Sequence, residues 1–124
     1  MNINIKTTNI ELTPAISDYV NKKIESLEKF VGSQKKDAET QVWVEIGKTT
    51  KHHEQGYIFR TEVQMRLPHA SLRAEAVNED LYASIDAVRD EVRREMSKTH
   101  GKQITKFRNG ARRVKDLLTG FYKR

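Results

Sequence analysis

The sequence predicts one α+β domain with the element order β-α-β-β-β-α, followed by a basic C-terminal segment. Three observations support this prediction: four stretches alternate apolar and polar residues, two longer stretches repeat apolar residues every three to four positions, and 124 residues suit a single domain. Because each strand has one polar and one apolar face, we expect a four-stranded mixed sheet with two helices packed on one face.

The first strand is predicted at residues 2–7, where Ile3 and Ile5 share a face. Thr13 followed by Pro14 is typical of a helix start, because threonine can cap free N–H groups and proline fits the first helical position. An apolar stripe with helical spacing then predicts a helix over residues 14–31. The stripe consists of Ile16, Val20, Ile24, Leu27 and Val31.

Three further strands are predicted from residue 39, at 59–67 and at 71–77. The polar segment 47–56, bounded by glycines, indicates a long hairpin loop, and Pro68 marks a turn. A helix connects the first two strands, so we expect them to be parallel, whereas the remaining neighbours should be antiparallel hairpins. The residues expected to face the core are Val42, Val44, Ile46, Phe59, Thr61, Val63, Met65, Leu67, Leu72, Ala74 and Ala76.

The second helix is predicted to begin at Asn78 as the N-cap and to run to residue 98 or 99. Glu79 and Asp80 are expected in its first turn, where carboxylates interact favourably with the helix dipole. Gly101, after His100, is expected to end it. Its apolar stripe consists of Leu81, Ile85, Val88, Val92 and Met96.

Composition excludes several classes of protein. The absence of cysteine excludes disulfides, thiolate zinc sites and a cysteine nucleophile. Neither a secretory leader nor an apolar run of about 18 residues is present, so we expect a cytoplasmic protein without a membrane span. His52 and His53 lack a convincing third ligand, which favours a solvated loop over a metal site. No nucleophile motif or phosphate-binding glycine loop occurs, so we expect no enzyme, no cofactor and no small-molecule substrate.

Charge is segregated along the chain. Residues 1–95 hold 14 basic and 16 acidic residues, whereas residues 96–124 hold nine basic residues and one acid, Asp116. This asymmetry predicts a polyanionic partner, which is RNA, DNA or an acidic membrane; the alternative is that the tail only aids solubility. Gly110 and Gly120 interrupt the helical spacing of the tail. We therefore expect a domain at 1–101 and a partly helical or flexible basic tail at 102–124, which becomes more helical when bound.

Two segments resemble a known family in the expected order. The first is IELTPAI at residues 10–16, with Tyr19-Val20 and KKIE at 22–25, and the second is DLYASID at 80–86. Together they are similar to the ribosome hibernation-promoting factors, also called ribosome-associated inhibitors or sigma-54 modulation proteins. The resemblance covers roughly residues 1–102. The chain departs from the family at Glu91 and Glu95, where lysine and glutamine are common.

The resemblance implies a fold similar to double-stranded RNA-binding domains. It also implies binding to ribosomal RNA of the small subunit near the decoding centre, where the protein blocks messenger and transfer RNA in idle ribosomes. By analogy, the chain is a short member or the N-terminal part of a long one, and is monomeric off the ribosome. Cations on a rigid frame would contact phosphates. The expected RNA-binding residues are Lys22, Lys23, Arg89, Arg93, Arg94, Lys98, Lys102, Lys106, Arg108, Arg112, Arg113 and Lys115.

Several of these residues have a structural alternative. Arg94 has Asp90 four residues before it and Arg89 has Asp86 three before it, so both arginines could serve only as intrahelical ion pairs. An intrahelical ion pair of this kind is not expected for Arg93, because the residue four positions before it is Arg89 and not an acid.

Two aromatic residues have alternatives as well. Tyr82 could stack on a base, but packing against the sheet is favoured. Trp43 is expected on the exposed sheet face, where Phe107 or Phe121 of the tail could cover it. The competing functions are a general double-stranded RNA-binding module and a membrane-surface protein anchored by the basic amphipathic tail.

Overall fold

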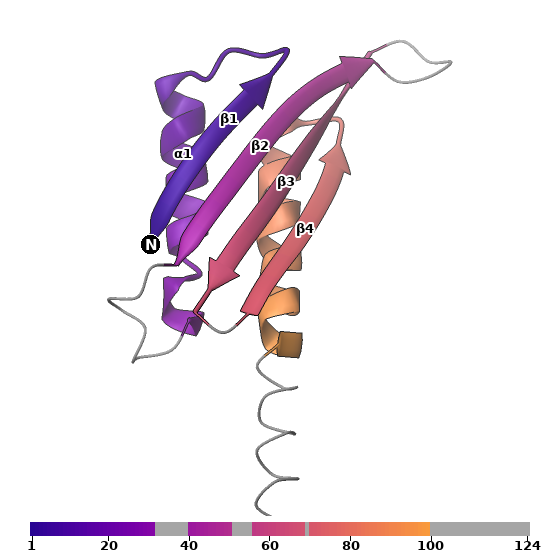
Figure 1. The fold of residues 1–124 in the computed structure, drawn as a ribbon. Helices are drawn as coiled ribbons and strands as arrows, with labels where there is room; N and C mark the ends of the chain where they lie inside the picture. Colours follow the sequence, from indigo (N-terminus) through magenta and orange to yellow (C-terminus); the bar gives the residue numbers. More distant parts are fainter. Residues whose placement is uncertain (32–39, 51–55, 69, 100–124) are drawn as a thin grey trace, which may run out of the picture.

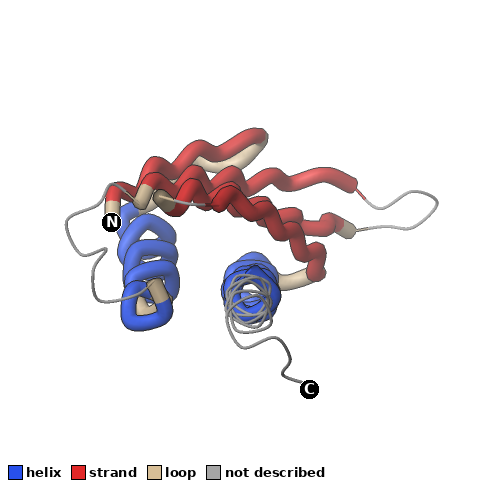
Figure 2. The backbone as a smooth tube through the Cα atoms, turned by 60° about the horizontal axis from the view of Figure 1, so that its bottom comes forward, coloured by secondary structure: helices blue, strands red, loops and turns tan. Residues whose placement is uncertain are grey.

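The computed structural model describes residues 1–31, 40–50, 56–68 and 70–99. One four-stranded sheet lies in front of two helices (Figure 1), and both helices lie on the same face of the sheet (Figure 2). The strands lie side by side in the order β1-β2-β3-β4. β1 pairs parallel to β2, and the other neighbours are antiparallel, so the predicted α+β class and mixed sheet are confirmed. The bounds are β1 Asn2–Thr8, β2 Gln41–Thr50, β3 Tyr57–Leu67 and β4 Ala70–Asn78.

Helix α1 begins where the sequence predicted but ends earlier. It spans Pro14–Glu25, and the Thr13 hydroxyl accepts a hydrogen bond from the Ile16 N–H at 3.2 Å. The predicted end at residue 31 is wrong, because the Ser26 hydroxyl donates to the Lys23 carbonyl at 2.5 Å and the chain tightens there. A short 3-10 helix, η1 (Glu28–Phe30), follows this turn. Gly32 lies outside the described residues.

In the hairpin between β2 and β3, the strands are longer and the loop is shorter than predicted. The pairing continues to Thr50 opposite Tyr57, so residues 47–50 belong to the sheet and not to the loop. Thr49 and Thr50, and the residues Tyr57 to Phe59 that pair with this end of β2, favour extended backbone, which outweighs the polarity that suggested a loop. Residues 51–55, with His52 and His53, lie outside the described part of the chain.

The second helix covers residues 81–99, where the described part of the chain stops, so its predicted end stays a prediction. Its N-cap differs from the prediction. Asp80 is the cap, because its carboxylate accepts a hydrogen bond from the Ala83 N–H at 2.8 Å. The Asn78 side chain instead accepts from the Asp80 N–H at 2.9 Å in an Asx turn before the helix. Glu79 and Asp80 therefore precede the first turn. His100 and Gly101 lie outside the described residues.

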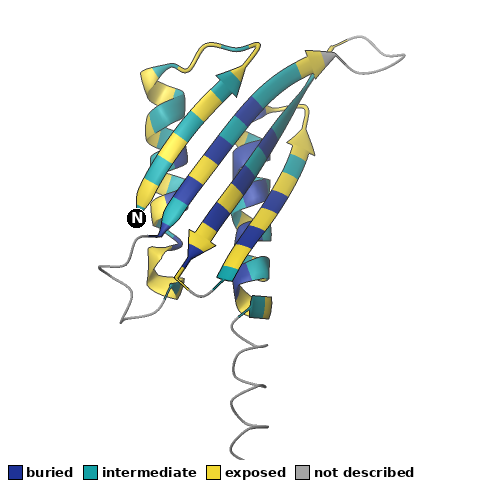
Figure 3. Ribbon diagram, in the orientation of Figure 1, coloured by how far each residue is buried: buried dark blue, intermediate teal, exposed yellow. Residues whose placement is uncertain are grey.

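The core lies between the sheet and the two helices. Buried and exposed residues alternate along the strands (Figure 3), and the predicted inward residues of β2, β3 and β4 all face the helices. Val20, Ile24 and Leu27 form the buried stripe of the first helical segment. Leu27 is fully buried although it lies beyond the end of α1, so the turn after α1 is part of the core. The second helix buries its whole predicted stripe, Leu81, Ile85, Val88, Val92 and Met96.

One buried polar contact joins the sheet to the second helix. The Thr61 and Ser84 hydroxyl oxygens lie 2.8 Å apart, and both residues are fully buried. The Ser84 hydroxyl donates to the Leu81 carbonyl at 2.7 Å, so the Thr61 hydroxyl is the donor of the pair. Thr61 therefore depends on Ser84 as its acceptor, whereas Ser84 keeps its own acceptor without Thr61.

Replacement of Ser84 by alanine is expected to cost more stability than replacement of Thr61 by valine. S84A leaves a buried hydroxyl donor without a partner, which costs about 1–3 kcal/mol, whereas T61V removes that donor and costs less than about 1 kcal/mol. The measurement is urea unfolding of both single variants and of the double variant. The double variant should lose less stability than the sum of the two single losses. Equal losses in the two single variants would contradict the assigned donor direction.

Candidate nucleic-acid interface

The two helices run parallel and touch along one outward-facing line. Residues at successive turns of α1 and η1 meet partners at successive turns of the second helix, so both helices have their C-terminal ends at the same end of the molecule (Figure 1). We call this line the helix seam. It consists of Tyr19, Lys23, Ser26 and Phe30 from the first segment and Tyr82, Asp86, Arg89 and Arg93 from the second helix.

The N-terminal half of the helix seam is held by an aromatic pair and a carboxylate. The Tyr19 and Tyr82 rings meet edge to face with centroids 4.9 Å apart, so the ring contact of Tyr82 is with α1 and not with the predicted sheet surface. The Tyr19 hydroxyl donates to the Asp86 carboxylate at 2.6 Å, and the Lys23 ammonium lies 3.2 Å from the same oxygen. Hydrogen bonding to Asp86 raises the pKa of Tyr19 and the pKa of Lys23.

The C-terminal half of the helix seam carries cations on an exposed aromatic ring. The Arg89 guanidinium donates to the Ser26 hydroxyl at 3.0 Å. The Arg93 guanidinium lies 4.0 Å from the centroid of the Phe30 ring, and the Lys29 ammonium lies 5.3 Å from the same centroid. We call Lys29, Phe30 and Arg93 the Phe30 cluster. Among the described residues, Arg93 makes one hydrogen bond, to Ser97 at 3.2 Å, so within this part of the chain most of its guanidinium donors have no partner.

The predicted RNA-binding cations of the helices fall into two groups. Lys23, Arg89, Arg94 and Lys98 each have a carboxylate partner, whereas Lys22 and Arg93 have none among the described residues. Hydrogen bonding to Glu91 raises the pKa of Arg94. The remaining predicted residues lie outside the described part of the chain; these are Lys102, Lys106, Arg108, Arg112, Arg113 and Lys115.

The two intrahelical pairs considered from the sequence are replaced by other partners. Arg94 pairs with Glu91 at 2.6 Å, three residues away, instead of with Asp90. Asp86 pairs across the seam with Lys23, which leaves Arg89 to its neighbour Asp90 at 3.4 Å. Spacing along one helix did not reveal these partners, since the other helix and the adjacent side chains compete for the same carboxylates.

The helix pair is electrically polarised from end to end. Residues 9–21 and 78–88, at and before the N-terminal halves of the helices, hold five acids and no base. Residues 22–31 and 89–99 hold seven bases and five acids. Because the helices are parallel, all seven bases lie toward the same end of the molecule (Figure 1).

Lys29, Phe30 and Ser26 were not among the residues predicted to bind RNA. The sequence could have revealed the seam residues of the first segment, because each of them comes one position before a residue of the apolar stripe. They therefore share the helical spacing of that stripe. The same reasoning places Tyr82, Asp86, Arg89 and Arg93 one position after the stripe of the second helix. Two such lines on helices that cover one sheet face are expected to meet.

The described residues contain no group of three or more histidine, cysteine, aspartate or glutamate side chains that could hold a metal ion. None of the helices in the described ranges is long and apolar enough to cross a membrane. The cations and the exposed ring of the Phe30 cluster can bind anions and flat rings.

Substitution of Asp86 by asparagine is expected to loosen the helix seam and to free the charge of Lys23. The melting temperature should fall by about 2–5 °C, because the Tyr19 hydroxyl and Lys23 both lose their anionic partner. The raised pKa values of Tyr19 and Lys23 mean that this stabilisation is present below about pH 10 and is lost as the pH rises further.

The matched control for this prediction is Asp18→Asn, which removes the same charge from α1 away from the seam. Thermal unfolding of the three proteins at pH 7 and at pH 11 measures the difference. If D86N and D18N melt at the same temperature at pH 7, Asp86 does not hold the two helices together.

The family model described as "Sigma 54 modulation protein / S30EA ribosomal protein" matches residues 3–104. The ribosome hibernation promotion factor of Bacillus subtilis is 33% identical over 108 residues, which cover 87% of this chain and 53% of that protein. The ribosome hibernation promoting factor of Pseudomonas putida is 28% identical over 113 residues, which cover 91% of this chain and 100% of that protein. The chain thus spans about half the length of some relatives and the full length of others.

Solved structures agree with the fold. The crystal structure of the N-terminal domain of Protein Y from Thermus thermophilus has a TM-score of 0.63 and 31% identity, over 80% of this chain and 99% of that one. A ribosomal subunit interface protein from Coxiella burnetii has a TM-score of 0.65 at 16% identity, over 82% of this chain and 99% of that one. The second likeness concerns the fold alone.

Proposed function

Because the chain belongs to the Sigma 54 modulation protein / S30EA ribosomal protein family, we propose that it is a non-enzymatic ribosome-binding factor that keeps idle ribosomes in hibernation. The proposed partner is the ribosomal RNA of the small subunit near the decoding centre, in the cytoplasm. A protein bound there would exclude messenger and transfer RNA. The names of the Bacillus subtilis and Pseudomonas putida relatives support the link to ribosome hibernation.

The observation that carries this proposal is the basic end of the helix pair. Lys22, Lys29 and Arg93 have no carboxylate partner among the described residues, and they lie on two helices that a common core holds rigid. Folded RNA presents phosphates at fixed positions, so rigidly placed and unpaired cations bind it with the least loss of entropy. Arg93 on the Phe30 ring adds a flat cation that can pair with a phosphate or stack on a base.

The basic tail at 102–124 is proposed to be a second RNA contact that is independent of the folded domain. Its excess of bases, eight against one acid, supports nonspecific attraction to phosphates and not a particular geometry. The tail would therefore add affinity, while the helix seam would give the orientation on the subunit.

The test is co-sedimentation of the full-length chain with purified ribosomal subunits on sucrose gradients at about 50 and 200 mM salt. We expect the chain to migrate with small subunits, with affinity falling steeply between the two salt concentrations. A full-length variant with glutamine at Lys106, Arg108, Arg112, Arg113 and Lys115 should bind more weakly and with a shallower salt dependence.

Two results would overturn the proposal. If the chain fails to migrate with small subunits even at 50 mM salt, ribosome binding is wrong for this chain. If an excess of bulk duplex RNA removes it from the subunits as readily as free subunits do, the chain is a general double-stranded RNA-binding module without preference for the ribosome.

A further inference from the structure

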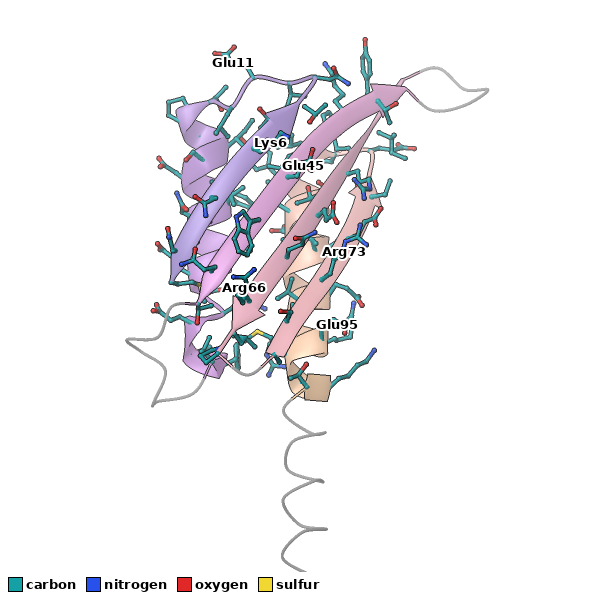
Figure 4. The ribbon with its side chains drawn as sticks, viewed as in Figure 1. Lys6, Glu11, Glu45, Arg66, Arg73 and Glu95 are labelled. Atoms are coloured by element: carbon teal, nitrogen blue, oxygen red, sulfur yellow. The ribbon has the colours of Figure 1, made fainter. Side chains whose placement is uncertain are left out.

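The open face of the sheet, opposite the helices, carries its outward side chains in rows that cross all four strands. Lys6, Glu45, Arg66 and Arg73 project from this face (Figure 4). The register of the strands defines three of these rows. We name them the glutamate row (Lys6, Glu45, Glu62, Glu75), the tryptophan row (Asn4, Trp43, Gln64, Arg73) and the amide row (Asn2, Gln41, Arg66, Ser71).

Glu62 and Glu75 of the glutamate row are paired with arginines, and the other two charges of the row, Lys6 and Glu45, are opposite in sign and stand at paired positions of β1 and β2. Arg60 pairs with Glu75 and lies 3.5 Å from Glu62, and Arg73 pairs with Glu62 from the other side. The hydrogen bond from Arg60 lowers the pKa of Glu75, which keeps this carboxylate ionised. This half of the face therefore has little charge left for a partner.

The other half of the face has the opposite character. The tryptophan and amide rows contain no carboxylate, and Arg66 has none as partner among the described residues. Trp43 is 39% exposed even though the Arg66 guanidinium lies 5.4 Å from the centroid of its ring. Open hollows of about 290 and 270 Å³ flank the indole on its two sides; the first is lined by Arg66 and Arg73, whereas the second extends to Lys6, Glu45 and Glu62 of the glutamate row. Both hollows are smaller than the usual pocket for a drug-sized molecule, about 300–1,000 Å³.

We propose that this half of the sheet binds an unpaired nucleotide of RNA. The base would stack on the Trp43 indole, the following phosphate would pair with Arg66, and the Gln64 and Asn4 amides would reach the base edge. An exposed ring beside a free cation, with amide groups on the neighbouring strands, suits single-stranded RNA, because every base offers a flat face and every nucleotide a phosphate. This inference rests on the proposed function for the identity of the partner, and adds a single-stranded contact on the opposite face.

Charge argues against the basic tail of the chain as the occupant. Phe107 or Phe121 could cover an indole, but the tail would bring its excess of cations to Arg66, which has no carboxylate partner among the described residues. At this position, the positive charge that repels the basic tail attracts a polyanion. The same reasoning favours RNA over a second copy of this chain, which carries a net charge of +6.

Trp43 is the sole tryptophan of the chain, so its fluorescence reports directly on the site. The experiment titrates the full-length protein at low salt with a single-stranded oligoadenylate of about ten nucleotides, and separately with duplex RNA of the same length. We expect saturable quenching by the single strand and at least about fivefold weaker quenching by the duplex, whose bases are already stacked. R66Q should weaken binding of the single strand about tenfold.

The matched control is K48Q, which removes one charge from β2 at a position where Lys48 lies over the Tyr57 ring and lines neither hollow, and it should change the affinity by less than about twofold. A second control is the variant K29E/R93E of the Phe30 cluster. It should lose binding to ribosomal subunits and keep most of the quenching, so that failure of the helix site and failure of the sheet site can be distinguished.

Each outcome of these experiments supports or overturns the proposed sheet site. If the chain migrates with subunits but the oligoadenylate gives no saturable quenching, or if K48Q and R66Q weaken the quenching equally, the sheet site is wrong while the ribosome proposal stands. If quenching is found without subunit binding, the sheet site stands as a general single-strand contact. If F107A/F121A increases the access of acrylamide to Trp43 in the free protein, the tail covers the indole and the inference is overturned.

Discussion

Reversal of two charges in the Phe30 cluster, in the variant K29E/R93E, is expected to lower the affinity for small ribosomal subunits about 100-fold at 100 mM salt. Each lost phosphate contact is worth about tenfold in affinity, and the new carboxylates repel the same phosphates. Both cations touch an exposed phenylalanine and have no carboxylate partner among the described residues, so the fold should tolerate the change. Quantitative co-sedimentation over a range of salt concentrations measures the effect, and the slope of affinity against salt should fall by about 2.

The control is K6E/K48E, which changes the net charge by the same amount on the sheet. Lys6 and Lys48 also have no carboxylate partner in the described ranges, and Lys48 likewise lies over an aromatic ring, that of Tyr57 at 4.6 Å. If both double variants lose affinity equally, binding depends on net charge alone and the helix end has no special part in it.

Truncation of Leu27 to alanine is expected to lower the free energy of unfolding by about 2–5 kcal/mol, because the side chain is fully buried and leaves a cavity in the core. Leu27 lies in the turn between α1 and η1, so its loss should also release η1 and with it the ring of Phe30. Chemical unfolding measures the stability, and the affinity for subunits should fall even under conditions where the variant is fully folded.

Phe30→Ala provides the comparison, since Phe30 is 37% exposed and ends η1, which directly follows the turn that contains Leu27. It should cost less than about 1 kcal/mol of stability and still weaken binding, because Arg93 loses the ring that holds its guanidinium. A stability loss in F30A as large as that in L27A would show that the ring is part of the core and not of the interface.

The periodic parts of the fold were predictable from the sequence, and the ends of its elements were less so. The stripes from Val20 to Leu27 and from Leu81 to Met96 are buried as predicted, since burial of one face imposes the helical period on the sequence. The end of α1 was missed, because a serine hydroxyl at residue 26 bonds to the backbone while the apolar spacing continues unchanged through Leu27. Asp80 was mistaken for a first-turn residue because Asn78 is an equally good cap by type.

The sequence predicted which residues are exposed at the candidate site, but not which of their charges pair with one another. The exposed cations of both helices and the exposed position of Trp43 follow from residue type and from the side of each stripe. The partner of each charge depends on which residues face one another across the seam. Asp86 binds Lys23, 63 positions earlier in the chain, and this separation carries no signal in a single sequence.

The parallel course of the two helices has a kinetic consequence. Five acids at one end and an excess of bases at the other make the domain an electric dipole. The peptide dipoles of the two helices point the opposite way, because they are positive at the end that carries the acids. The side-chain charges exceed the half charges of the helix ends, so the basic end remains positive. In the field of a polyanion such a molecule turns while it diffuses, so that its basic end leads and fewer encounters are wasted. Association should therefore be faster, and more sensitive to salt, than the small net charge of the domain alone would give.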